Sequence, residues 1–234
     1  MARVELSRRQ NAETIPDTEQ RDQALFALVN ESVRNGASGE RLATVSDLVE
    51  KIQSTELHDR AWSLIRRIEV RNLSRAANFD EAFALAIKLP DAAIRAQTLR
   101  EVSVAVTRKG SQTIRGSDVL SEALAAINKA DASIERSRLT FTISGDFVNL
   151  KEYEKAFEAL QSATDSLGAL RRDDFEQTTK AAAPNNLFDY RSTFGRLGSV
   201  DFDRAMLVAQ SIKWREFRLA AEIVTCHSLL TRKG

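Results

Sequence analysis

The fold is indicated by one stretch of sequence, Phe79–Leu99, which reads FDEAFALAIKLPDAAIRAQTL. From Phe79 onward, its apolar and small residues recur at i, i+3, i+4 and i+7, which is the spacing of one helix face. Asn78 is suited to cap this helix, Pro90 ends it, and Asp91 is suited to cap the next. The stretch therefore predicts two helices joined by a sharp corner.

The same pattern returns near the C-terminus in Phe202–Glu222, which reads FDRAMLVAQSIKWREFRLAAE. The two copies match at Phe79 and Phe202, Asp80 and Asp203, Ala82 and Ala205, Ala86 and Ala209, and Arg95 and Arg218. A weaker copy, YEKAF, begins at Tyr153. A repeated helix pair is typical of an α-solenoid. In this interpretation the four matched alanines are close helix–helix contacts, and the two arginines bond groups of the adjacent unit.

Helical periodicity continues through most of the chain and predicts about eleven or twelve antiparallel helices. One segment, Leu139–Gly145, alternates as a strand does and contains a glycine, which is unfavourable in a helix. We interpret it as helical because its flanks are helical and because Leu139, Ile143 and Phe147 share one helical stripe. The predicted fold is all-α, an α-α superhelix with irregular repeats and no sheet.

The predicted domain organisation is a flexible N-terminal arm over residues 1–17 followed by one α-solenoid domain over residues 18–231. The arm is expected because its sequence is polar and mixed. A candidate internal break lies at 181–186, where the sequence reads AAAPNN.

The composition bounds the function. A net charge of +1 gives no overall attraction to nucleic acid or to anionic membranes. One cysteine excludes an internal disulfide, so nothing indicates an oxidising compartment. The sequence has no signal-peptide pattern and no run long enough to cross a bilayer. The expectation is a soluble protein, cytoplasmic by default, or exported if a signal has been removed.

The segments ANFDEAFALAIKLPDAAIRAQTL and SVDFDRAMLVAQSIKWREFRLAAEIVTCHSLL resemble bacterial helical-repeat proteins. Such proteins look like distant relatives of tetratricopeptide and HEAT-type α-solenoids. The resemblance covers most of residues 20–231 and implies a superhelical scaffold. It transfers no active site, and the strict 34-residue tetratricopeptide pattern is absent.

Arg67, Arg71 and Arg75 form the main candidate site, because spacing of i, i+4 and i+8 places them on one helix face. Such a stripe of like charges requires acids or an anion nearby. In one interpretation it is structural, and acids of the preceding helix, such as Asp47 or Glu50, supply the charge. In the other it is open and binds a phosphate or an acidic partner.

Trp214 is the second candidate, because it stands at the corner of the Phe202 copy. It either contacts a partner or folds over the end of the array as a cap. Cys226 and His227 are adjacent, so they point about 100° apart on a helix, which is poor geometry for one metal ion. We expect Cys226 to be buried on the apolar side of the last helix.

The sequence has no catalytic, nucleotide-binding or metal-binding signature, so no enzyme activity, cofactor or metal is predicted. The first hypothesis is a non-catalytic scaffold that binds a protein or peptide. The alternatives are an enzyme-associated domain and a weak anion or nucleic-acid binder that uses the arginine stripe. Nucleic acid is the less favoured partner because only 6% of residues are aromatic.

Overall fold

A computed structural model describes residues 2–35, 40–173, 176 and 188–231. Within these residues the chain forms twelve α-helices, one π-helical turn and no strand, which confirms the all-α prediction. The chain divides into two compact units, Met1–Ile114 and Arg115–Gly234, and each is described by itself. The predicted break at 181–186 lies outside the described residues.

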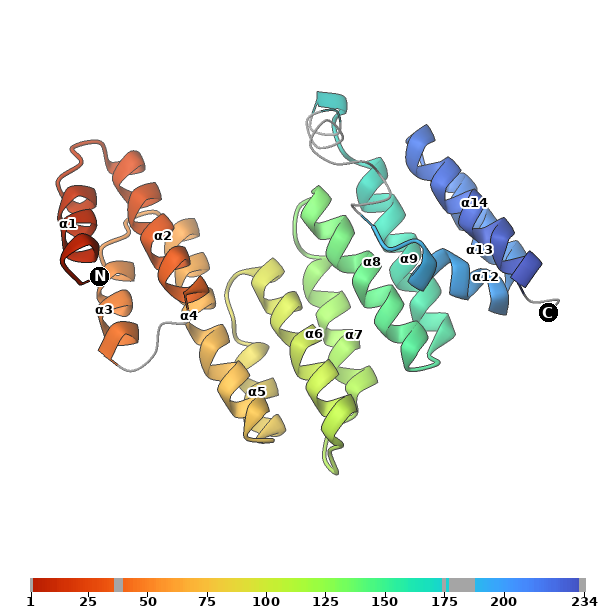
Figure 1. Ribbon diagram of the computed structural model, residues 1–234, viewed down its shortest axis with the longest axis horizontal. Coiled ribbons are helices and arrows are strands. Elements are labelled where there is room, and N and C mark those ends of the chain that lie inside the picture. Colours follow the sequence, from red (N-terminus) through yellow and green to blue (C-terminus); the bar gives the residue numbers. More distant parts are fainter. Residues whose placement is uncertain (1, 36–39, 174–175, 177–187, 232–234) are drawn as a thin grey trace. The chain divides into compact units, whose positions relative to one another are not determined.

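In the described part of the N-terminal unit there are six helices (Figure 1). They are α1 (Ala2–Glu13), α2 (Thr18–Arg34), α3 (Glu40–Val49), α4 (Thr55–Arg75), α5 (Phe79–Ala86) and α6 (Ala92–Lys109). The C-terminal unit contains α7 (Gly116–Ile127), α8 (Ile134–Asn149), α9 (Tyr153–Gly168), the π-helical turn η1 (Arg191–Gly195), α12 (Arg196–Val200), α13 (Phe202–Ser211) and α14 (Arg215–Thr231).

The segment predicted to be a flexible arm instead contains a packed helix. Helix α1 covers Ala2–Glu13, and Ala12 belongs to the buried core that it shares with α2, α3 and α4. Glu13 accepts a hydrogen bond from Lys51 at 2.6 Å, and Arg8 bonds Glu31 at 3.2 Å. These contacts attach α1 to the rest of the unit. The polar sequence of this segment was therefore not sufficient reason to predict a flexible arm.

A buried carboxylate fixes the position of α4 relative to α2. Asp22 of α2 is only 2% exposed, and its Oδ2 accepts backbone N–H bonds from Gln53 at 3.0 Å and Ser54 at 2.7 Å. Ser54 in turn caps α4 by accepting from the N–H of Leu57. A carboxylate that accepts two backbone bonds holds the start of α4 in one place, which sets the register of the two helices that form the candidate site.

The Phe79 stretch forms the predicted helix pair, α5 and α6. Asp91 caps α6 by accepting from the N–H of Ile94 at 2.7 Å, as predicted. Asn78 is the N-cap residue of α5, as predicted, but its side chain makes no capping bond. Ala82 and Ala86 are fully buried, as expected of close helix–helix contacts.

The C-terminal unit is built around α8, which packs along α9 and against η1. The segment Leu139–Gly145 is helical, as predicted, and lies inside α8. Phe141 of this segment contacts the rings of Phe188 and Phe194 at centroid distances of 4.6 and 6.1 Å. The apparent strand alternation thus reflects a helix that is buried on more than one side.

The second helix pair is α13 and α14, with Ala205 and Ala209 fully buried between elements. Helix α12 lies against α14, and Gly198 permits this close approach. A Cβ atom at Gly198 would lie 2.6 Å from Oγ of Ser228 and 3.1 Å from Cγ2 of Thr225. Any side chain there would force the two helices apart.

Two corners have the same backbone geometry. Ala77, which precedes α5, and Lys151, which precedes α9, have φ angles of 63° and 61°. At each corner the next residue donates a backbone hydrogen bond five positions back, from Asn78 to Leu73 at 2.9 Å and from Glu152 to Phe147 at 3.0 Å. This is the Schellman pattern of helix ends, formed here without glycine.

Candidate interaction pocket

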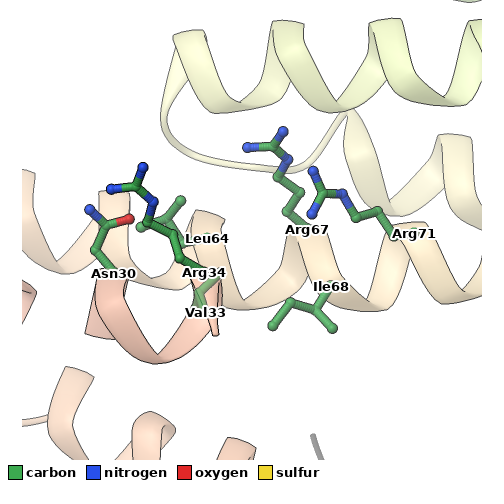
Figure 2. A pocket seen from close by; sticks show the side chains of 7 residues that line it. All are labelled: Asn30, Val33, Arg34, Leu64, Arg67, Ile68 and Arg71. Atoms are coloured by element: carbon green, nitrogen blue, oxygen red, sulfur yellow. The ribbon is translucent and has the colours of Figure 1, made fainter. Parts of the chain in front are cut away.

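The candidate site is a pocket of about 410 Å³ between α2 and α4, which we call the α2–α4 pocket (Figure 2). Helix α2 contributes Asn30, Val33 and Arg34, and helix α4 contributes Leu64, Arg67, Ile68 and Arg71. Three of these side chains are aliphatic and half-buried. The remaining lining consists of one amide and three guanidinium groups. Figure 2 shows the three guanidinium groups extending to the same side of the two helices.

Arg67 and Arg71 share one carboxylate, that of Glu101 on α6. Nε and Nη2 of Arg71 lie 2.9 and 3.0 Å from the two carboxylate oxygens. Arg67 also uses Nε and Nη2, and its Nε lies 3.3 Å from Oε2. Each oxygen therefore accepts from both arginines, while the Nη1 group of each arginine takes no part in the pair. Paired, bidentate bonds of this kind hold both guanidinium groups in a fixed orientation.

The paired charges shift the pKa values of Glu101 and Arg71. Partial burial alone would raise the pKa of Glu101, but the hydrogen bonds and positive charges of Arg71 and Arg67 outweigh it, so its pKa is lowered. The hydrogen bonds that Arg71 donates to Glu101 raise the pKa of Arg71 above its usual value. Two guanidinium groups and one carboxylate give this trio a net charge of +1.

Arg34 adds a further positive charge to the same pocket. It lies in the last turn of α2, where a cation interacts favourably with the helix dipole. Its side chain is exposed, and within the described part of the chain no carboxylate bonds it. Three arginines line the pocket and one carboxylate, that of Glu101 on α6, lies beside it, which leaves two positive charges next to the aliphatic side chains.

The arginine stripe is divided between two environments. Arg67 and Arg71 line the pocket, whereas Arg75 is exposed and does not. The backbone carbonyl of Arg75 accepts a bond from Lys109 at 2.6 Å, which ties the end of α4 to the end of α6. The stripe therefore contributes two of its three side chains to the candidate site.

The prediction that Asp47 or Glu50 supplies the negative charge for the arginine stripe was wrong. Neither Asp47 nor Glu50 bonds the stripe within the described residues, because this face of α4 packs against α6 and Glu101 is the acid that meets it. Arg34 was not predicted as a site residue. In the sequence, the only signal near it is the following pair Asn35 and Gly36, residue types that often end helices.

Trp214 belongs to the C-terminal unit, whereas the residues of the α2–α4 pocket belong to the N-terminal unit. Its indole Nε1 donates to the carbonyl of Leu167 at 2.9 Å, and Nζ of Lys213 lies 4.9 Å from the ring centroid. The ring is half-buried and bonds the end of α9. Of the two predictions for Trp214, these contacts fit the one in which the ring packs on neighbouring residues as a cap. Partner binding by Trp214 stays a prediction.

The histidines and the cysteine form no metal site. No group of three or more His, Cys, Asp or Glu side chains that could hold a metal ion occurs in the described ranges. The expectation that Cys226 is buried was wrong, since it is exposed. Phe217, Ala221, Thr225 and Ser228 form the buried side of α14, and Cys226 lies away from that side.

Comparison of the chain with protein-family models, with curated proteins and with solved structures finds no match. Among the described residues, no helix is both long and apolar enough to cross a membrane.

Proposed function

We propose that the chain is a non-catalytic protein-binding scaffold of the α-solenoid type, and that the α2–α4 pocket binds an acidic peptide segment. The observation that carries the proposal is the excess of positive charge beside an aliphatic wall. The carboxylates of an acidic peptide would neutralise the positive charge of the pocket, and an aliphatic side chain of the peptide would cover the aliphatic wall.

Recurring geometry supports a repeat scaffold. Helices α5, α7 and α9 begin at residues 79, 116 and 153, at equal spacings of 37 residues. The corners that precede α5 and α9 each contain one residue in the left-handed conformation. Nη1 of Arg95 donates to the carbonyl of Leu89, and Nη1 of Arg136 donates to that of Ala130, each six positions back across a corner. Such equivalent corners are expected when one helix-pair unit recurs.

The lining of the pocket favours binding over catalysis. Its seven residues include no carboxylate, histidine, cysteine or hydroxyl group that could act as a general base or nucleophile. Arginines orient and neutralise anions but do not exchange protons at neutral pH. An enzyme-associated role would therefore depend on a partner to supply the chemistry.

A binding measurement tests the proposal. The probe is a fluorescently labelled eight-residue peptide of alternating glutamate and leucine, titrated with the full chain while anisotropy is recorded. Replacement of glutamate by glutamine in the probe should abolish binding. Arg34→Gln should weaken binding about fivefold, since a charge-assisted bond at an exposed site contributes about 1 kcal/mol.

Arg108→Gln is the matched control, because it removes the same charge from an exposed arginine of the same unit, in the last turn of α6. It should leave the affinity unchanged. Equal loss in Arg34→Gln and Arg108→Gln would contradict the pocket as the site. Tighter binding of a single-stranded oligonucleotide than of the peptide would instead favour the anion-binding alternative.

A further inference from the structure

A second surface lies in the C-terminal unit, where exposed apolar side chains are concentrated. Seven large hydrophobic residues of the described chain are exposed, and six of them lie between residues 200 and 230. These six are Val200, Leu207, Leu219, Ile223, Leu229 and Leu230. Helix α14 carries four of them. Exposed apolar side chains that gather on one surface mark interaction sites on soluble domains.

Helix α14 is apolar on two opposite sides. One side packs into the unit through Phe217, Ala221 and Thr225. The other side faces outward and carries Leu219, Ile223, Cys226 and Leu230, which we call the outer seam. Ile223 and Leu230 are 67% and 76% exposed. A helix with one structural face requires only one apolar stripe, so the outer seam needs another explanation.

The spacing of the outer seam is that of a coiled coil. Its residues follow one another at intervals of four, three and four, which matches the d, a, d and a positions of a heptad repeat. Leucine at d and isoleucine at a favour two-stranded parallel pairing. The seam covers about two heptads, which is short for an isolated coiled coil. Here, however, α14 is already held in helical form by its contacts with α12 and α13.

We propose that the outer seam binds the outer seam of a second copy of this chain, with the two α14 helices parallel. The flanking charges favour this occupant and this direction. Glu222 falls at a g position and His227 at the following e position, five residues on. In a parallel pair these two positions meet across the seam, so each Glu222 carboxylate accepts a hydrogen bond from His227 of the other copy. An antiparallel pair would place Glu222 against Leu229.

The energetics fit a weak, concentration-dependent dimer. Pairing buries four apolar or thiol side chains per copy without the entropic cost of folding a helix. The contact is smaller than a standard protein–protein interface. The outer seam shares no residue with the α2–α4 pocket, so the inference does not depend on the proposed function.

Disulfide cross-linking of the full chain tests both the contact and its direction. The parallel arrangement places Cys226 opposite Cys226 of the second copy, whereas an antiparallel arrangement places it opposite Ile223. Copper–phenanthroline with oxygen accepts the two electrons released when the two thiols join. We expect a reducible band at twice the 26.1 kDa chain mass, with a yield that rises with protein concentration.

Two glutamate variants complete the experiment. Ile223→Glu should weaken self-association, measured by sedimentation, by about tenfold or more. The reason is that a charge replaces an aliphatic group that becomes buried in the dimer. Ile87→Glu is the matched control, since Ile87 is also exposed, at 41%, but lies in the N-terminal unit. A chain that stays monomeric at millimolar concentration would overturn the proposal. So would a dimer that forms without cross-linking at Cys226, or one that survives Ile223→Glu.

Discussion

Replacing Glu101 by glutamine tests the arginine–glutamate trio that shapes the α2–α4 pocket. The carboxylate accepts hydrogen bonds from two arginines, and the Arg67 side chain is only 14% exposed. Glutamine has nearly the same shape but no charge, so Arg67 would remain largely buried with a weaker acceptor. Hydrogen bonds to charged groups contribute about 1.5–3 kcal/mol when buried. Because the Arg71 side chain is 46% exposed, solvent screening lowers this value. The expected loss is about 1–3 kcal/mol.

The assay is urea denaturation of the full chain, followed by circular dichroism at the helical band. Glu158→Gln is the matched control, because Glu158 is an exposed residue within α9. It should change the free energy of unfolding by less than about 0.5 kcal/mol. If Glu101→Gln and Glu158→Gln were equally stable, the trio would contribute nothing measurable, and its role in fixing Arg67 and Arg71 would be refuted.

Further predictions concern the core, a corner and pH. Leu99→Ala should cost about 2–5 kcal/mol because Leu99 is 1% exposed; an unchanged urea midpoint would contradict its placement. Leucine at Ala82 or Ala205, both fully buried, should cost about 1–3 kcal/mol by overpacking, and unaltered melting of both variants would count against these helix contacts. Ala77→Gly should stabilise the chain by up to about 1 kcal/mol, since it relieves a left-handed alanine; a lower melting temperature would contradict this. The pKa of Glu101 is lowered by folding, so its stabilisation is present above about pH 5 and is lost as pH falls through the folded pKa. The stability difference between wild type and Glu101→Gln should therefore shrink as the pH falls below about 5, and a difference that grew on acidification would reverse the assigned sign.

Local patterns in the sequence were sufficient to predict most of the described helices, with α1 as the exception. The corner at Asp91 and the helical state of Leu139–Gly145 depend on residues within a few positions of one another. Helix α1 was missed because its sequence has no apolar stripe, although Ala12 packs into the core. Cys226 was misplaced because α14 is apolar on two sides, and periodicity alone does not show which side faces inward.

Contacts between distant residues limited the prediction of the site. Arg67 and Glu101 are 34 positions apart, and their pairing depends on how α4 packs against α6. The stripe was visible in the sequence because its members share one helix. The pocket was not visible, since Arg34 and Asn30 come from a different helix that is positioned through the buried Asp22.

The central claim is that the α2–α4 pocket binds an acidic peptide. The most direct test is methyl nuclear magnetic resonance of the full chain, labelled at isoleucine, leucine and valine, during titration with the glutamate–leucine peptide. We predict that the methyl signals of Val33, Leu64 and Ile68 shift first and saturate together, while those of Leu207 and Ile223 stay in place. Shifts at Leu207 or Ile223 with no change at Val33, Leu64 and Ile68 would contradict the claim.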